Sequence, residues 1–126
     1  MAMDYIATND APKAIGPYSQ AVRTGNLLFL SGQIPLDPAT GELVPGDFPS
    51  QVRRVFENLK AVLAAAGATF AHVTRATVYL TDLGNFQSLN GIYAEYFGEH
   101  KPARSTVGVA SLPRGATVEI DLIAVV

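Results

Sequence analysis

Apolar residues recur along this chain with two different spacings. Between about residues 48 and 66, and again between about residues 85 and 97, they recur every three or four positions, the spacing of one face of an α-helix. Asp47 precedes the first of these segments as a candidate N-cap, and Gly67 and Gly98 follow the two segments as helix ends. The pattern therefore predicts two amphipathic helices.

Other apolar residues alternate with polar ones, as in strands that are buried on one face. The predicted strands of the first two-thirds of the chain span residues 5–8, 19–24, 27–33 and 73–80. Two more, residues 103–110 and 117–125, flank a connection that contains Pro113 and Gly115, and we expect them to pair as a hairpin. After the first short strand the elements follow in ββαβαββ order, which predicts a single α+β domain over residues 1–126, with two helices on one face of a mixed sheet in a two-layer arrangement.

Arg104 and Glu119 are the first candidate site residues. If the two C-terminal segments pair with their apolar faces aligned, both side chains lie on the same polar face of neighbouring strands. A small anionic substrate could bridge them there. The alternative is a structural ion pair, since an arginine beside a glutamate on a half-exposed strand often contributes little even to stability.

Two of the predicted strands are apolar on both faces. Leu27 and Phe29 alternate with Leu28 and Leu30, and residues 73–80 carry apolar side chains in both directions. Such strands are expected where both faces of the sheet are covered, and two helices can cover only one face. We therefore expect a homo-oligomer in which a second copy covers the other face and a ligand site lies at the interface.

Composition disfavours several classes of site. The 126 residues include no cysteine and only two histidines, so disulfides, thiolate chemistry and a metal site are not expected. The nine basic residues are scattered and the formal net charge is −2, which disfavours nucleic acid as a partner. No apolar run reaches the ~18 residues of a membrane span. The first residues lack the features of a signal peptide, so a soluble, cytoplasmic protein without membrane contacts is expected.

Four ordered motifs give the chain a resemblance to a known family. They are Ala-Ile-Gly-Pro-Tyr-Ser-Gln at residues 14–20, Leu-Ser-Gly-Gln-Ile-Pro at 30–35, Asn-Gly-Ile-Tyr at 90–93, and Pro-Ala-Arg-Ser at 102–105 together with Val-Glu-Ile at 118–120. With these motifs the chain resembles the RidA (reactive intermediate deaminase, YjgF-like) family over nearly its whole length. The resemblance implies the chorismate-mutase-like fold of YjgF proteins and a homotrimer whose sheets form a central barrel, with active-site clefts at the subunit interfaces.

The same resemblance implies a hydrolytic deaminase that needs no cofactor. Its substrates would be reactive 2-imino acids and the enamines from which they form, such as those that lead to 2-iminobutanoate and 2-iminopropanoate. Its products would be 2-oxo acids and ammonia. Such imines leak from the enamine products of pyridoxal-phosphate-dependent dehydratases, so the implied role is enamine detoxification.

The family's site residues can be carried onto this sequence position by position. Arg104 would hold the substrate carboxylate as a bidentate fork, and Glu119 would orient the attacking water and relay protons. The backbone at Gly32 and Thr106 would bind the imine and carboxylate ends. The other residues that the resemblance places in the cleft are Tyr18, Ser31 and Asn90. Thr106 is a departure, because many hydrolytic relatives carry cysteine at that position.

Two other functions stay open on the sequence. A protein of the same fold could bind small carboxylates as a sensor or regulator without turnover. The family has also been described as endoribonucleases that act on messenger RNA. That function is disfavoured, because this acidic chain offers no basic groove, no histidine pair for acid–base cleavage and no aromatic run on which bases could stack.

Overall fold

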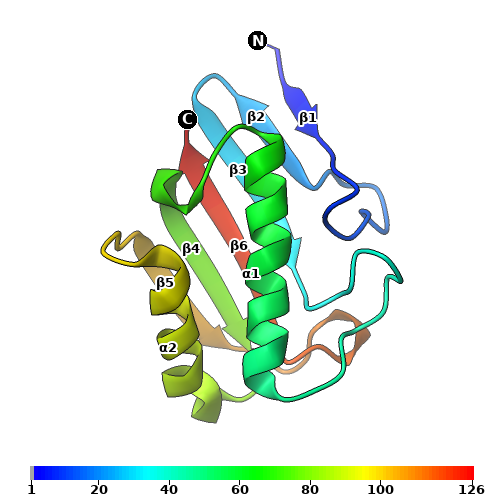
Figure 1. Cartoon of the computed structure of the whole chain (residues 1–126), viewed down its shortest axis with the longest axis vertical. Helices are drawn as coiled ribbons and strands as arrows, with labels where there is room; N and C mark the ends of the chain where they lie inside the picture. Colours follow the sequence, from blue (N-terminus) through cyan, green and yellow to red (C-terminus); the bar gives the residue numbers. More distant parts are fainter. Residues whose placement is uncertain (1) are drawn as a thin grey trace.

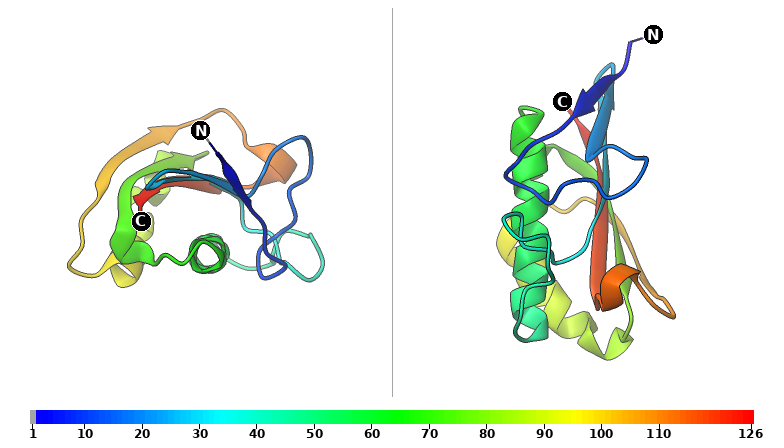
Figure 2. Two further views of the ribbon diagram at one scale, coloured as in Figure 1. Left: turned by 90° about the horizontal axis from the view of Figure 1, so that it is seen from above. Right: turned by 90° about the vertical axis from the view of Figure 1, so that its right-hand side faces the viewer.

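The computed structural model describes residues 2–126 and has two layers, a six-stranded mixed sheet and two α-helices on one of its faces (Figures 1 and 2). In chain order the elements are β1 (Asp4–Ile6), β2 (Ala21–Thr24), β3 (Leu27–Gln33), α1 (Phe48–Ala65), β4 (Val73–Leu80), α2 (Phe86–Phe97), β5 (Ala103–Gly108) and β6 (Val118–Val125). The strand order across the sheet is β1-β2-β3-β6-β4-β5. The predicted two-layer α+β class is confirmed, and the short edge strand β1, expected at residues 5–8, precedes the ββαβαββ order.

Local signals set the limits of the helices. Asp47 caps α1, since its carboxylate accepts a hydrogen bond from the Ser50 backbone amide at 3.0 Å, and the hydrogen bonds with Ser50 lower the pKa of Asp47. The chain leaves the helix through Gly67 at φ +75°, a left-handed conformation that favours glycine. Both helices begin and end within one residue of the predicted limits. In the described part of the chain, no helix is long and apolar enough to cross a membrane.

Aromatic contacts fix α2 against α1. The ring of Phe56 stacks on Tyr96 with centroids 4.7 Å apart, and it meets Tyr93 edge-on at 5.8 Å. The Tyr96 hydroxyl donates a hydrogen bond to the Glu57 carboxylate at 2.8 Å. Burial, together with this bond, raises the pKa of Tyr96 to about 12. These contacts give α2 a defined position over the sheet.

The predicted C-terminal hairpin is wrong. β6 lies between β3 and β4 and is antiparallel to both, whereas β5 pairs in parallel with β4 at the sheet edge. The crossover through α2 returns the chain in the direction of β4, which makes β5 parallel to it. The connection after β5 then carries the chain past β4 to the centre of the sheet (Figure 1). Turn residues such as Pro113 and Gly115 indicate that the chain reverses direction, but they do not determine which strand the next segment pairs with.

A second correction follows from this topology. Arg104 lies opposite Ala76 of β4, and Glu119 lies opposite Tyr79 of the same strand. Residues opposite each other in a ladder share a face, and residues three apart along a strand point to opposite faces. Ala76 is fully buried beneath the helices. Within one chain, therefore, Arg104 is on the helix side and Glu119 on the other side, and the expectation of a shared polar face is wrong.

The face of the sheet without helices exposes large apolar side chains. Phe29 of β3 is 42% exposed, whereas its neighbour Leu28 is 0% exposed beneath the helices. In the ladder, Phe29 lies opposite Val22 and Ile123, and Leu27 lies opposite Val125. This continuous apolar surface bears out the two-sided pattern of the sequence, and a second copy of the chain as its cover stays a prediction.

Candidate active site

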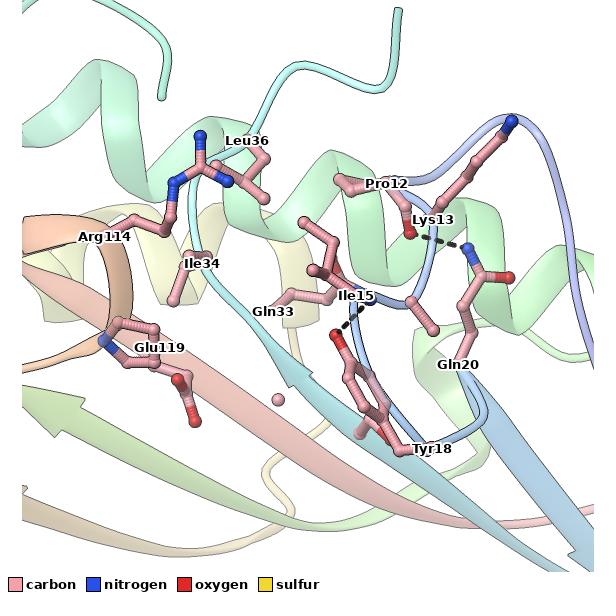
Figure 3. A pocket seen from close by; sticks show the side chains of 14 residues that line it. Pro12, Lys13, Ile15, Tyr18, Gln20, Gln33, Ile34, Leu36, Arg114 and Glu119 are labelled. Atoms are coloured by element: carbon pink, nitrogen blue, oxygen red, sulfur yellow. Dashed lines mark hydrogen bonds between the residues drawn. The ribbon is translucent and has the colours of Figure 1, made fainter. Parts of the chain in front are cut away.

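A pocket of about 410 Å³ opens where β3 and β6 separate (Figure 3). The pairing of these strands shifts between Leu30 and Gln33, so β3 carries an extra residue in a bulge at Ser31 and Gly32. The predicted site residues that line this cavity are Tyr18, Ser31, Gly32 and Glu119. We call it the Glu119 pocket.

Gly32 allows the Glu119 carboxylate to lie directly against the bulged backbone. A Cβ atom added at residue 32 would stand 2.9 Å from the Glu119 carboxyl carbon, closer than real Cβ contacts permit. A close approach of another group to the Gly32 backbone was expected. Within this chain the group that approaches it is the carboxylate of Glu119, the catalytic candidate. Any larger residue would displace that carboxylate.

The loop before β2 forms a second wall of the Glu119 pocket, and hydrogen bonds hold it. The Ile15 amide donates to the Tyr18 hydroxyl at 3.2 Å, and the Ser31 hydroxyl donates to the Ser19 carbonyl at 2.5 Å. Gln20, only 5% exposed, donates to the Pro12 carbonyl at 2.8 Å and accepts from the Thr8 amide at 2.7 Å. The Ser31 hydroxyl thus helps to hold this wall in place. Gln20 is the last residue of the motif at residues 14–20, and its place in that motif is the sequence signal that would have identified it as part of the pocket.

Asn58 holds the third wall and was not anticipated from the sequence. It is 0% exposed on α1, and its amide donates to the Leu36 carbonyl at 3.0 Å. The Arg54 guanidinium donates to the Asn58 side-chain oxygen at 3.0 Å, which fixes the orientation of the amide. A polar residue within the apolar stripe of a helix is the sequence signal that would have found it.

Glu119 itself has no polar partner in residues 2–126. The two ion pairs of the described chain, Arg53–Glu95 and Arg114–Glu42, do not involve it, and no hydrogen bond reaches its carboxylate. Burial, and then the negative charge of Asp121 on the same strand face, raise the pKa of Glu119. Asp121 in turn accepts a hydrogen bond from Tyr79 at 3.0 Å. A carboxyl group of raised pKa in a cavity is suited to accept and return a proton.

On the opposite face of the sheet, Arg104 is held from several sides. Its Nη1 donates to the Asn90 side-chain oxygen at 2.8 Å, and its Cζ lies 4.8 Å from the ring centroid of Tyr93 and 5.5 Å from that of Phe86. Neither ion pair of residues 2–126 includes Arg104. Neutral groups thus orient the guanidinium, and no counter-ion in the described chain competes with a ligand for its charge. We call this cluster, with Thr106, the Arg104 site.

Two polar atoms of the Arg104 site are buried without a hydrogen-bond partner in the described chain, the Tyr93 hydroxyl and the Thr106 hydroxyl. Thr106 lies two residues from Arg104 on β5, on the same side of the strand. Burial raises the pKa of Tyr93, although the Arg104 charge acts in the opposite direction. Buried polar atoms are almost always satisfied, so a bound molecule or a second protein chain is the expected partner.

The structure thus divides the predicted site residues into two sets. Glu119, Gly32, Ser31 and Tyr18 meet in one pocket, and Arg104, Asn90 and Thr106 meet on the other face. One set carries an unpaired anion and the other an unpaired cation. Nowhere in residues 2–126 do three or more potential metal ligands cluster.

Comparisons with known proteins agree on one family. A family model described as Endoribonuclease L-PSP matches residues 8–126. Protein DfrA of Myxococcus xanthus is 61% identical over 127 residues, which cover 99% of this chain and 97% of the relative. The 2-iminobutanoate/2-iminopropanoate deaminase of Mus musculus is 48% identical over 120 residues, which cover 95% and 89%. The crystal structure of a protein of the conserved Rid family from Yersinia pestis superimposes with a TM-score of 0.96 at 48% identity, covering 99% of this chain and 100% of that one.

Proposed function

This chain belongs to the RidA (YjgF-like, Endoribonuclease L-PSP) family, and from that membership we propose that it is a hydrolytic deaminase of reactive 2-imino acids. In the reaction, a 2-iminium carboxylate and water give a 2-oxo acid anion and an ammonium ion. The name of the mouse relative supports 2-iminobutanoate and 2-iminopropanoate as substrates.

One observation carries the proposal: the chain holds an arginine without a counter-ion and a carboxylate without a cation, each in a site shaped around it. A 2-imino acid carries the two complementary groups next to each other, a carboxylate for Arg104 and an iminium for Glu119. Uncompensated charges of this kind are costly unless a ligand or partner supplies the opposite charge.

Because the two sets lie on opposite faces of one sheet, a single chain cannot present both to one small substrate. We propose that a homotrimer forms the complete site, with Arg104 of one copy facing the Glu119 pocket of another. The exposed apolar surface around Phe29 supports such an assembly, since a second copy would cover it.

In the proposed mechanism Arg104 binds the substrate carboxylate and Glu119 handles the protons. Glu119 accepts a proton from water while the water oxygen bonds to the iminium carbon, which gives a carbinolamine. Glu119 then returns the proton to the amine nitrogen. The C–N bond breaks with its electron pair on nitrogen, the hydroxyl proton is transferred to the departing ammonia, and a C=O group remains. The raised pKa of Glu119 suits both transfers.

The test is ammonia release from 2-iminopropanoate freshly generated by a serine dehydratase. We expect the protein to speed formation of the oxo acid from free imine without changing the rate of enamine formation. Glu119→Gln, which keeps the shape of the side chain, is the matched control. If free imine decays at the same rate with and without the protein, the deaminase proposal fails, and the alternative of a carboxylate-binding or regulatory protein gains support.

The ribonuclease function named by the family model has less support. His72 Nδ1 accepts a hydrogen bond from the Thr69 amide at 3.0 Å in a capping box, and His100 Nε2 lies 2.6 Å from the Val73 carbonyl. Both histidines are thus engaged by backbone groups. Neither lines the Glu119 pocket.

A further inference from the structure

Arg114 lines the Glu119 pocket but has no part in the mechanism above. It belongs to the one-turn 3₁₀ segment η3 (Pro113–Gly115), in the connection between β5 and β6. Figure 3 shows Arg114 and Glu119 toward one end of the cavity, with Tyr18 and Gln20 toward the other. The pocket thus contains a cation that forms no ion pair with Glu119.

The backbone conformation at Arg114 sets the direction of its side chain. Arg114 has φ +62°, and within residues 2–126 no other non-glycine residue has a positive φ. Left-handed backbone is unfavourable for arginine, so the surrounding turn must impose it. Pro113 precedes the residue, Gly115 follows it at φ +73°, and the Ala116 amide closes the turn on the Pro113 carbonyl at 3.1 Å.

The Arg114 guanidinium is only partly engaged. Nη2 donates to the Gly41 carbonyl at 3.2 Å and lies 3.4 Å from a Glu42 carboxylate oxygen. The pair is solvent-exposed, and such pairs are weak and easily exchanged. No hydrogen bond from Nε or Nη1 occurs within the described chain, so one edge of the guanidinium is available for a second carboxylate.

The pocket is also larger and more apolar than a three- or four-carbon substrate requires. Its volume of about 410 Å³ falls in the range of about 300–1,000 Å³ typical of sites for drug-sized ligands. The lining of the pocket also includes the apolar residues Ile34, Leu36 and Pro113. A substrate that fits this wall has an apolar stretch followed by an anionic end.

We propose that Arg114 is a specificity-determining residue that binds the distal carboxylate of dicarboxylic 2-imino acids such as 2-iminoglutarate. This inference rests on the proposed deaminase function. The 2-carboxylate binds Arg104 of a second copy, the imine lies at Glu119, the two methylenes contact the apolar wall, and the distal carboxylate binds the free edge of Arg114. Hydrolysis of 2-iminoglutarate by water follows the reaction given above for 2-imino acids and gives 2-oxoglutarate and ammonium.

The first experiment compares kcat/KM for 2-iminoglutarate and 2-iminobutanoate, both generated in the cuvette by an amino-acid oxidase. Wild type should favour the dicarboxylate. Arg114→Gln should lower kcat/KM for 2-iminoglutarate about tenfold, mainly through KM, as expected for loss of a partly exposed charge-assisted hydrogen bond. The value for 2-iminobutanoate should stay within about twofold, since that substrate lacks the distal group. Arg23→Gln, on the exposed β2–β3 hairpin, is the matched control and should change neither.

Arg114→Gly separates the side chain from the turn, because glycine adopts the left-handed backbone without strain. It should show the same selective loss as Arg114→Gln in a fully folded protein. Lys13 is the other basic residue that lines the pocket. Equal losses on both substrates, no loss on either, or a selective loss in Lys13→Gln in place of the Arg114 variants would each overturn the inference.

Calorimetric binding of inert 2-oxo acids keeps this test independent of turnover. Wild type should bind 2-oxoglutarate more tightly than 2-oxobutanoate, and both Arg114 variants should abolish that preference. If wild type hydrolyses neither imine but shows this preference, the deaminase proposal fails and the Arg114 assignment stands. If it hydrolyses both and shows no preference, the Arg114 assignment fails and the deaminase proposal stands.

Discussion

The Arg104 site and the Glu119 pocket hold their charged groups in opposite ways. Arg104 is held by Asn90 and by two aromatic faces, so its guanidinium is oriented before any ligand arrives. Glu119 has no polar partner in the described chain, and burial together with Asp121 disfavours its charge. A preorganised cation suits binding, whereas a carboxylate of raised pKa suits proton transfer. The difference predicts that substitutions on the two sides affect different kinetic constants.

Glu119→Gln is expected to have the largest effect. The amide keeps the shape of the side chain but cannot accept the proton from water, so kcat should fall by roughly 100-fold or more. Binding of pyruvate, which needs no proton transfer, should persist. Steady-state ammonia release and calorimetry measure the two quantities. A parallel loss of pyruvate binding would contradict the division of roles between the two sites.

Arg104→Lys should act mainly on binding. Lysine keeps the charge but loses the planar fork and its contact with Asn90, so binding of pyruvate should weaken by about 1.5–3 kcal/mol, the scale of hydrogen bonds to charged groups. The apparent KM should rise accordingly. If both this variant and Glu119→Gln leave turnover intact and only lower the melting temperature, the two residues are structural and the catalytic assignment is wrong.

Gly32→Ala should have a smaller effect, confined to the Glu119 pocket. The added methyl group would stand 2.9 Å from the Glu119 carboxyl carbon, and a half-buried side chain can move to relieve the overlap. We expect kcat to fall about tenfold while pyruvate binding at Arg104 changes little, since a small misplacement of a catalytic group costs up to ~100-fold. Gly41→Ala is a control for glycine substitution as such, because nothing lies within 4 Å of an added Cβ there. Equal losses in both variants would argue against the Gly32–Glu119 contact.

The smallest predicted effect concerns stability and pH. Because burial raises the pKa of folded Glu119 above its unfolded value, its contribution to stability is fully present below the unfolded pKa, near 4.5, and is lost as the pH rises through the folded pKa. Glu119→Gln, which never ionises, should therefore melt slightly higher than wild type at pH 7. The difference should vanish below pH 4.5. Thermal melts across this range test the sign, and a less stable variant at pH 7 would mean that a cation in the assembly stabilises Glu119.

The sequence by itself determined the features that depend on neighbours along the chain. The spacing of apolar residues and the Asp47 and Gly67 signals located the first helix to within one residue, because helical contacts lie three or four residues apart. The motifs also contain the predicted site residues other than Thr106, since each motif is a short local segment. Even the apolar second face around Phe29 was evident from alternation along one strand.

Only the tertiary structure decided how these segments meet. Alternation tells which residues of one strand share a face, but the identity of the next strand depends on contacts far apart in the sequence. The placement of β6 between β3 and β4, and of β5 beside β4, put Arg104 and Glu119 on opposite faces, where a hairpin would have placed them together. The same long-range contacts brought Asn58 and Arg114 to the Glu119 pocket. Nothing along the chain predicts this for Arg114, and Asn58 is marked only as a polar residue within the apolar stripe of α1, because the geometry of a site depends on how the strands and helices pack against each other.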